Sequence, residues 1–135
     1  MIELAMHAGN SGLLQKDISE SQNIPLKYLD KIISGLRSAE LITNVSGKKS
    51  GYILNRKPSK ISVYDIYHAF EGKLTIIHCL NEITSCRKNK RCASQEIWSE
   101  LNEGMKTILS KNTLDQLTIT QKKLDSTEKE NIEVN

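Results

Sequence analysis

The sequence predicts a mainly α-helical fold with a small β-hairpin, namely a winged helix-turn-helix followed by a long dimerisation helix. Three observations predict it: an amphipathic helical pattern over residues 25–39, two short β-prone runs just after it, and a longer apolar helical pattern over residues 95–111. We expect four segments, which are a winged helix (1–72), a cysteine-bearing loop (73–94), a dimerisation helix (95–117) and a disordered tail (118–135).

The helix over residues 25–39 has one apolar face and one polar face. Pro25 suits its first turn, because proline has no N–H to satisfy and its φ is already helical. Apolar side chains recur at helical spacing at Leu26, Leu29, Ile32, Ile33 and Leu36. The opposite side carries Lys27, Asp30, Lys31, Ser34 and Arg37. A solvated helix of an ordinary core can show the same two faces, so the neighbouring segments decide between the two interpretations.

The segment before this helix favours a helix-turn-helix. Leu13, Leu14 and Ile18 put apolar residues on one side of a short helix, QKDISES. Residues 22–25 then make a connection of the length that helix-turn-helix motifs use. We therefore interpret the helix over 25–39 as a recognition helix.

The segment after it favours a wing. Residues 41–45 and 52–54 are β-prone and flank SGKKSG, whose glycines and serines permit a tight reversal. In a winged helix the recognition helix enters a DNA groove and the wing contacts phosphate. The residues expected in the major groove are Lys27, Tyr28, Asp30, Lys31 and Arg37, and those expected on phosphates are Lys48 and Lys49.

Charge is distributed unevenly along the chain. Residues 1–60 hold nine Lys and Arg against five Asp and Glu, whereas residues 61–135 hold ten against eleven. The basic surplus therefore lies in the segment expected to meet DNA. Aromatic residues make up only 4% of the chain, which argues against base stacking on single strands. No apolar run approaches the roughly 20 residues that span a bilayer, so we expect a cytoplasmic protein without membrane contact.

Another helix is expected to close the core. Ser62 followed by Asp65 is a helix-start signature, and Gly72 marks the end of the pattern. The buried face is expected at Val63, Ile66, Tyr67 and Phe70.

The only three cysteines, Cys79, Cys86 and Cys92, lie in one short window. An odd number of cysteines in a reducing compartment indicates metal or redox chemistry rather than disulfides. The basic run RKNKR between the last two would offset the negative charge of a thiolate-bound cluster. Structural zinc sites usually show tighter C-x2-C pairs, so an iron–sulfur cluster, 2Fe–2S or 4Fe–4S, is preferred and zinc is second. Three unrelated thiols beside a solvated basic loop are the plain alternative.

A long apolar stripe covers residues 95–111, with Ile97, Trp98, Leu101, Met105, Ile108 and Leu109. A helix this apolar needs a partner. We predict the same helix of a second copy, because palindromic DNA sites call for two-fold symmetric dimers. Packing onto its own domain is the alternative. Thr113 and Gln116 resemble a short capping box, but beyond Leu117 the chain is charged and weakly periodic, which predicts the disordered tail.

The chain resembles the Rrf-type winged-helix transcriptional regulators, typified by the iron–sulfur-cluster regulator IscR and the nitric-oxide sensor NsrR. The resemblance runs from Met1 to about Leu117. It rests on LQKDISESQNI, IPLKYLDKIISGLRSAELI, the wing ending in Gly51 and Tyr52, IxVYDIYHAFEG, the three cysteines and Trp98. It implies a homodimeric regulator of a palindromic duplex operator, which we expect to be a repressor. It also implies a cluster on Cys79, Cys86 and Cys92 that senses iron–sulfur status, nitric oxide or redox state.

Three departures from the family pattern qualify this expectation. The sequence opens within the family's first helix, so we expect a misassigned start or a shortened chain. The fourth ligand of IscR-like members is a His where this chain has Gln95, and that of NsrR-like members lies upstream of Met1. We therefore expect this chain to hold a cluster weakly and often to lack it. Asp30 and Ser46 replace a recognition Glu and a wing Arg of IscR-like members, so operator preference should differ.

Two other functional classes were weighed against a cluster-controlled regulator. No Walker lysine loop, nucleophile elbow or H-E-x-x-H occurs, and His78 beside Cys79 is no evidence of a catalytic pair, so we expect no enzyme. A thiol- or zinc-switched regulator on the same scaffold stays open as the alternative.

Overall fold

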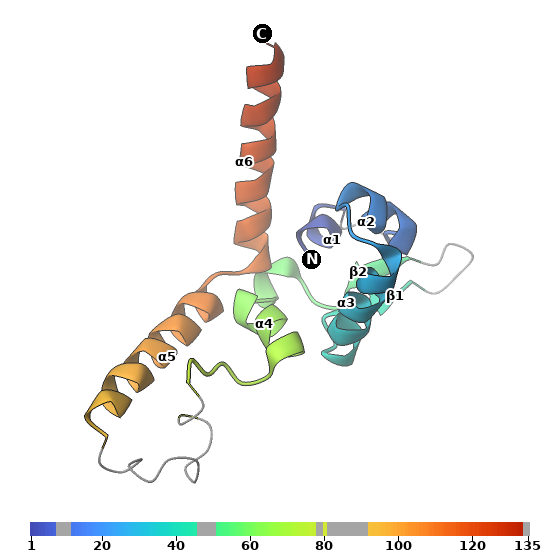
Figure 1. Ribbon diagram of the computed structural model, residues 1–135. Coiled ribbons are helices and arrows are strands. Elements are labelled where there is room, and N and C mark those ends of the chain that lie inside the picture. Colours follow the sequence, from blue (N-terminus) through green and yellow to red (C-terminus); the bar gives the residue numbers. More distant parts are fainter. Residues whose placement is uncertain (8–11, 46–50, 78–79, 81–91, 134–135) are drawn as a thin grey trace.

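The computed structural model describes residues 1–7, 12–45, 51–77, 80 and 92–133. The elements are α1 (Ile2–Met6), α2 (Gln15–Ser21), α3 (Leu26–Ser38), β1 (Ile42–Asn44), β2 (Tyr52–Leu54), a 3-10 turn η1 (Pro58–Lys60), α4 (Val63–Glu71), α5 (Ala93–Lys111) and α6 (Leu114–Glu133). Figure 1 shows α1, α2, α3 and the hairpin gathered on one side, α5 on the other with α4 between them, and α6 projecting away from both. The order and arrangement confirm the predicted winged helix.

The inner face of α3 forms the centre of the core. Leu29, Ile33 and Leu36 are buried, as their spacing predicts. They pack with Ile18 of α2 and with residues of α1 and β1 in one apolar cluster. Leu26 was expected on the same face, but its side chain is 50% exposed. It belongs to the first turn of α3, one turn before the buried Leu29, and so lies at the edge of this cluster.

Strand β2 forms backbone hydrogen bonds on both of its sides. β1 and β2 are antiparallel with Ile42 opposite Leu54, and Leu13 adds a bridge on the other side of β2. The Leu13 N–H donates to the Tyr52 carbonyl at 3.0 Å, and the Tyr52 N–H donates to the Leu13 carbonyl at 2.8 Å. A Cβ on Gly51 would lie 2.9 Å from the carbonyl carbon of Gly12. Gly51 therefore serves mainly to let two backbones cross, since no side chain fits between them.

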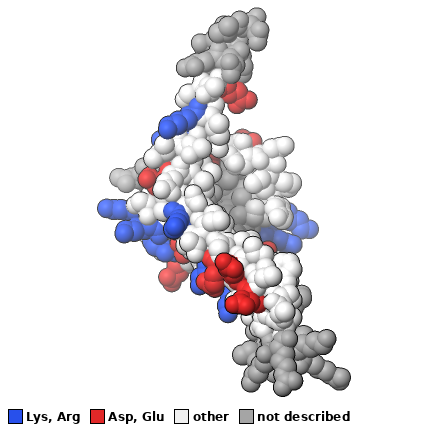
Figure 2. Space-filling view, turned by 90° about the vertical axis from the view of Figure 1, so that its left-hand side faces the viewer, with Lys and Arg blue, Asp and Glu red and all other residues white. Residues whose placement is uncertain are grey.

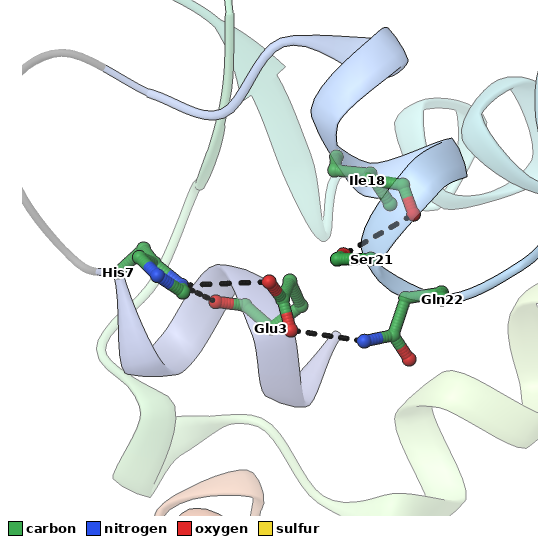
Figure 3. Close-up of polar contacts among 5 residues, drawn as sticks. All are labelled: Glu3, His7, Ile18, Ser21 and Gln22. Carbon is green, nitrogen blue, oxygen red and sulfur yellow. Dashed lines mark hydrogen bonds and ion pairs between the residues drawn. The ribbon is translucent and has the colours of Figure 1, made fainter.

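Polar contacts tie the five-residue helix α1 to the end of α2 (Figure 3). The Gln22 Nε2 donates to Glu3 Oε2 at 2.9 Å, and His7 Nδ1 lies 3.7 Å from Glu3 Oε1. Leu4 and Ala5 are buried beneath these contacts. So short a helix is marginal alone, and this packing stabilises it.

Helix α4 begins and ends where the sequence predicts. The Ser62 N–H donates to Asp65 Oδ2 at 2.8 Å and the Asp65 N–H donates to Ser62 Oγ at 3.1 Å, which is a capping box. Gly72, with φ of +69°, follows the last turn. Phe70 was expected to be buried but is 47% exposed. Its ring contacts α3 at Gly35, where an added Cβ would come within 2.6 Å of a ring carbon, so Gly35 makes room for one part of the ring while the rest meets water.

A second backbone bridge joins the two halves of the molecule. The Leu114 N–H donates to the Ile61 carbonyl, and the Val63 N–H donates to the Asn112 carbonyl, both at 2.8 Å. Ile61 and Leu114 are each 0% exposed. The connection between η1 and α4 is thus bound directly to the connection between α5 and α6.

The expectation of a disordered tail over residues 118–135 is wrong for residues 118–133, because α6 continues to Glu133. Its start is capped by Thr113 and Gln116: the Thr113 N–H donates to Gln116 Oε1 at 3.0 Å. Its first turns pack against α1 and η1, and Thr118 is buried there. These contacts, invisible in a weakly periodic sequence, supply the burial that a helix in water needs. None of the described helices is long and apolar enough to cross a membrane.

Replacing Leu114 by alanine should lower the free energy of unfolding by about 2–5 kcal/mol, because a fully buried side chain is cut back and leaves a cavity. Leu124→Ala on the same helix is the control, since Leu124 is 59% exposed, and it should cost less than about 1 kcal/mol. Urea unfolding followed by circular dichroism at one protein concentration measures both. Equal losses would show that α6 is not anchored through Leu114.

Candidate nucleic-acid interface

The outer face of α3 carries all five recognition residues predicted from the sequence. Lys27, Tyr28, Asp30, Lys31 and Arg37 are exposed. Tyr28 has 61% of its surface in water, which is unusual for an aromatic side chain without a partner. Because the opposite face of α3 is buried, these side chains are held outward together on one rigid element.

A groove runs between the outer part of α3 and strand β2. It has a volume of about 410 Å³ and is lined by Asp30, Ile33, Ser34, Arg37, Ser38 and Tyr52. Its lining therefore offers a carboxylate, a guanidinium and three hydroxyls, with Ile33 as its only aliphatic side chain. Such groups can donate to and accept from the edges of bases.

One polar contact at this surface was not foreseen from the sequence. The Gln15 Nε2, at the first residue of α2, donates to Asp30 Oδ1 at 2.5 Å. Gln15 was placed in the first helix of the motif but not at the interface. The signal that could have found it is its position at the very start of that helix, which in this motif lies close to the recognition helix.

The wing is described only at its base. Val45 donates its N–H to the Gly51 carbonyl at 2.8 Å, which closes the described part of the hairpin. Lys48 and Lys49, predicted on phosphates, lie outside the described residues.

Of the three predicted metal ligands, only Cys92 lies within the described residues; Cys79 and Cys86 lie outside them. Cys92 is half-buried at the start of α5, with its Sγ 3.1 Å from Ser94 Oγ. A thiolate fits this position, since the N-terminus of a helix favours negative charge. Within the described part of the chain, no three His, Cys, Asp or Glu residues come together as a metal site.

The polar side of α5 is acidic. Glu96, Glu100 and Glu103 line an open hollow of about 650 Å³ together with Cys92. Figure 2, which views the molecule from the α5 side, shows acidic side chains gathered over the lower part of this face and basic ones toward its edges. Phosphates would be repelled here, so this face is distinct from the α3 surface.

Another side of α5 is apolar and uncovered. Ile97, Trp98, Leu101, Met105 and Ile108 are exposed, Ile108 by 62%. A different side packs on α4 and on the segment that follows it. The Lys106 Nζ lies 5.9 Å from the centre of the Tyr64 ring of α4, and the buried Asn102 accepts the N–H of Ile76, beyond the end of α4, at 3.2 Å. Packing onto its own domain therefore accounts for only one side of α5 among the described residues.

Comparison with known proteins identifies the family. A family model described as "Rrf2: Iron-dependent Transcriptional regulator" matches residues 1–120. The chain belongs to the Rrf2 family. Members are transcriptional regulators rather than enzymes, as the missing catalytic motifs predicted.

Curated Rrf2 relatives carry one recurrent name. The chain is 30% identical over 125 residues to the HTH-type transcriptional regulator IscR of Xenorhabdus nematophila, covering 93% of this chain and 76% of the relative. It is 30% identical over 131 residues to IscR of Yersinia pseudotuberculosis, covering 97% and 79%. These matches confirm the resemblance drawn from the motifs.

Solved Rrf2 structures share the fold under two names. CymR, named the global cysteine regulator of B. subtilis, matches with a TM-score of 0.71 at 28% identity, covering 88% of this chain and 87% of that one. IscR of T. potens matches with a TM-score of 0.70 at 28% identity, covering 89% and 78%. The winged-helix fold and the role of a DNA-binding transcriptional regulator are thus shared by this chain.

Proposed function

We propose that this Rrf2 protein is a cytoplasmic homodimeric repressor of a palindromic operator, whose DNA affinity is controlled by an iron–sulfur cluster on Cys79, Cys86 and Cys92. The observation that carries the proposal is the α3 helix, whose inner face is buried and whose outer face displays basic and polar side chains. A helix held in this way can enter the major groove without rearranging.

In this proposal the outer face of α3 lies in the major groove. Lys27 and Lys31 contact phosphates at the groove edge, while Asp30, Arg37 and Tyr28 reach toward bases. Lys48 and Lys49 of the wing contact phosphates beside the groove. The exposure of the five α3 residues and the basic surplus of residues 1–60 support this assignment.

Replacing both Lys27 and Lys31 by alanine should weaken binding to every duplex and reduce the slope of log affinity against log salt by up to about two. Fluorescence anisotropy across a salt series measures the slope. Lys106→Ala combined with Lys111→Ala is the matched control, because it removes the same charge from α5. If the control flattens the slope and the α3 variant does not, the interface lies elsewhere.

The second copy in the proposed dimer covers the apolar side of α5. A contiguous row of large apolar side chains rarely stays in water, and a two-fold operator requires two recognition helices. The exposed residues Ile97, Leu101, Met105 and Ile108 recur at helical spacing along α5, which suits a helix crossing its own copy.

Leu101→Lys should place a charge in this apolar interface and yield monomers, because an unpaired charge there loses its hydration. Ser110→Lys, at an exposed position on the polar side of α5, should leave the dimer intact. Sedimentation velocity over a dilution series measures both. Dimers of normal affinity in Leu101→Lys would remove this side of α5 from the interface.

Three observations support the cluster. The family model is described as iron-dependent, curated relatives are named IscR, and Cys92 stands at the start of the helix proposed to form the dimer. A ligand at Cys92 would be close enough to α5 to alter how the two recognition helices are spaced. A regulator without a cluster, switched by oxidation of its three thiols or by zinc, is the second candidate. The structural likeness to CymR, a cysteine regulator, favours it as the alternative.

Protein purified without oxygen should contain iron and sulfide, at less than full occupancy because Gln95 stands where IscR-like members have a His ligand. Cys92→Ala should abolish the iron, whereas Ser94→Ala, which removes only the hydroxyl beside that thiol, should retain it. Metal analysis and an absorption spectrum measure both. Stoichiometric zinc without iron, or full iron in Cys92→Ala, would contradict the cluster.

A further inference from the structure

We infer that Gln15 is a positioning residue that holds the Asp30 carboxylate for a cytosine in the operator, an inference that rests on the proposed role of α3 in the major groove. Gln15 begins α2 and Asp30 lies in the second turn of α3, so their bond joins the two helices of the motif. Asp30 is exposed and Gln15 is half-buried, and neither residue belongs to the apolar core. The bond therefore adds little to the core and acts at the surface that faces DNA.

A carboxylate on this surface needs a specific partner. Asp30 is the only acidic residue of α3, and phosphates repel it. An ionised carboxylate can only accept hydrogen bonds, and among the bases of the major groove the amino group of cytosine is the donor that Asp and Glu read. Operators that present only hydrogen-bond acceptors opposite Asp30 should therefore bind more weakly.

Gln15 determines how the carboxylate is presented. Its Nε2 bonds to Oδ1 of Asp30 and leaves Oδ2 for a base. Asp30 also lines the groove shared with Ser34 and Arg37, whose side chains can donate hydrogen bonds. Without Gln15 the carboxylate could rotate among several orientations, and the energy difference between cytosine and other bases would fall.

The test is selection of binding sites from random duplex DNA, with preference read at each base pair. We expect wild type to prefer cytosine at one position of each half-site, and Asp30→Asn to change that preference to adenine, which asparagine reads. Gln15→Ala should reduce discrimination at that position about tenfold, the scale of one good base contact, and leave other positions unchanged.

A second pair of variants tests the bond itself. In Asp30→Asn the Gln15 Oε1 can accept from the asparagine amide, so the side chain stays held and adenine should be read at full strength. In Gln15→Ala with Asp30→Asn that bond is absent, and discrimination for adenine should fall about tenfold. Equal discrimination in the two variants would show that Gln15 does not position residue 30.

The matched control is Gln22→Ala. Gln22 makes the same amide-to-carboxylate bond at the other end of α2, to Glu3 and away from α3 (Figure 3). It should leave every base preference unchanged.

Wild-type preference in Gln15→Ala would overturn the inference, as would a loss confined to a different base pair, which would mean that Gln15 reads a base itself. If wild type selects no sequence at all, the proposed DNA-binding function of α3 fails first, and this inference fails with it.

Discussion

The backbone pairing of Ile61 with Leu114 is the constraint on which the arrangement of the other elements depends. Both side chains are fully buried, and the hydrogen bonds beside them fix the start of α4 against the junction of α5 and α6. These bonds fix the winged helix relative to the two C-terminal helices. A shift between the two parts would leave buried N–H and C=O groups without hydrogen-bond partners. The position of Cys92 relative to α3 follows from this joint through α4 and α5.

A second consequence of the packing is that different residues of α3 stabilise the fold and form its exposed surface. Its stability comes from Leu29, Ile33 and Leu36, whereas the groups that face outward contribute almost nothing to the core. Residues such as Asp30 can therefore differ from those of relatives without loss of the fold. The fold of this chain can therefore match those of CymR and IscR at 28% sequence identity, while its outward side chains differ from theirs.

The features that the sequence predicted correctly are those determined by neighbours in the chain. The Ser62 and Asp65 capping box, the buried spacing of α3 and the paired strands each depend on residues no more than about a dozen positions apart. The errors at Leu26, Phe70 and the tail all depend on which distant element covers the side chain. Gln15 went unnoticed for the same reason, since its partner Asp30 lies on another helix. The roles assigned to Lys48, Lys49, Cys79 and Cys86 remain predictions.

The pairing of Ser62 with Thr113 joins residues roughly 50 positions apart, with a bearing on how the protein is made. The ribosome adds about 5–20 residues per second, and the N-terminal part of a chain can fold first as it emerges. Residues 1–72 leave the ribosome well before Leu114, so Ile61 stays in water for several seconds of synthesis. The growing chain thus cannot complete its core until Leu114 has left the ribosome, and the support beneath the recognition surface is finished only then.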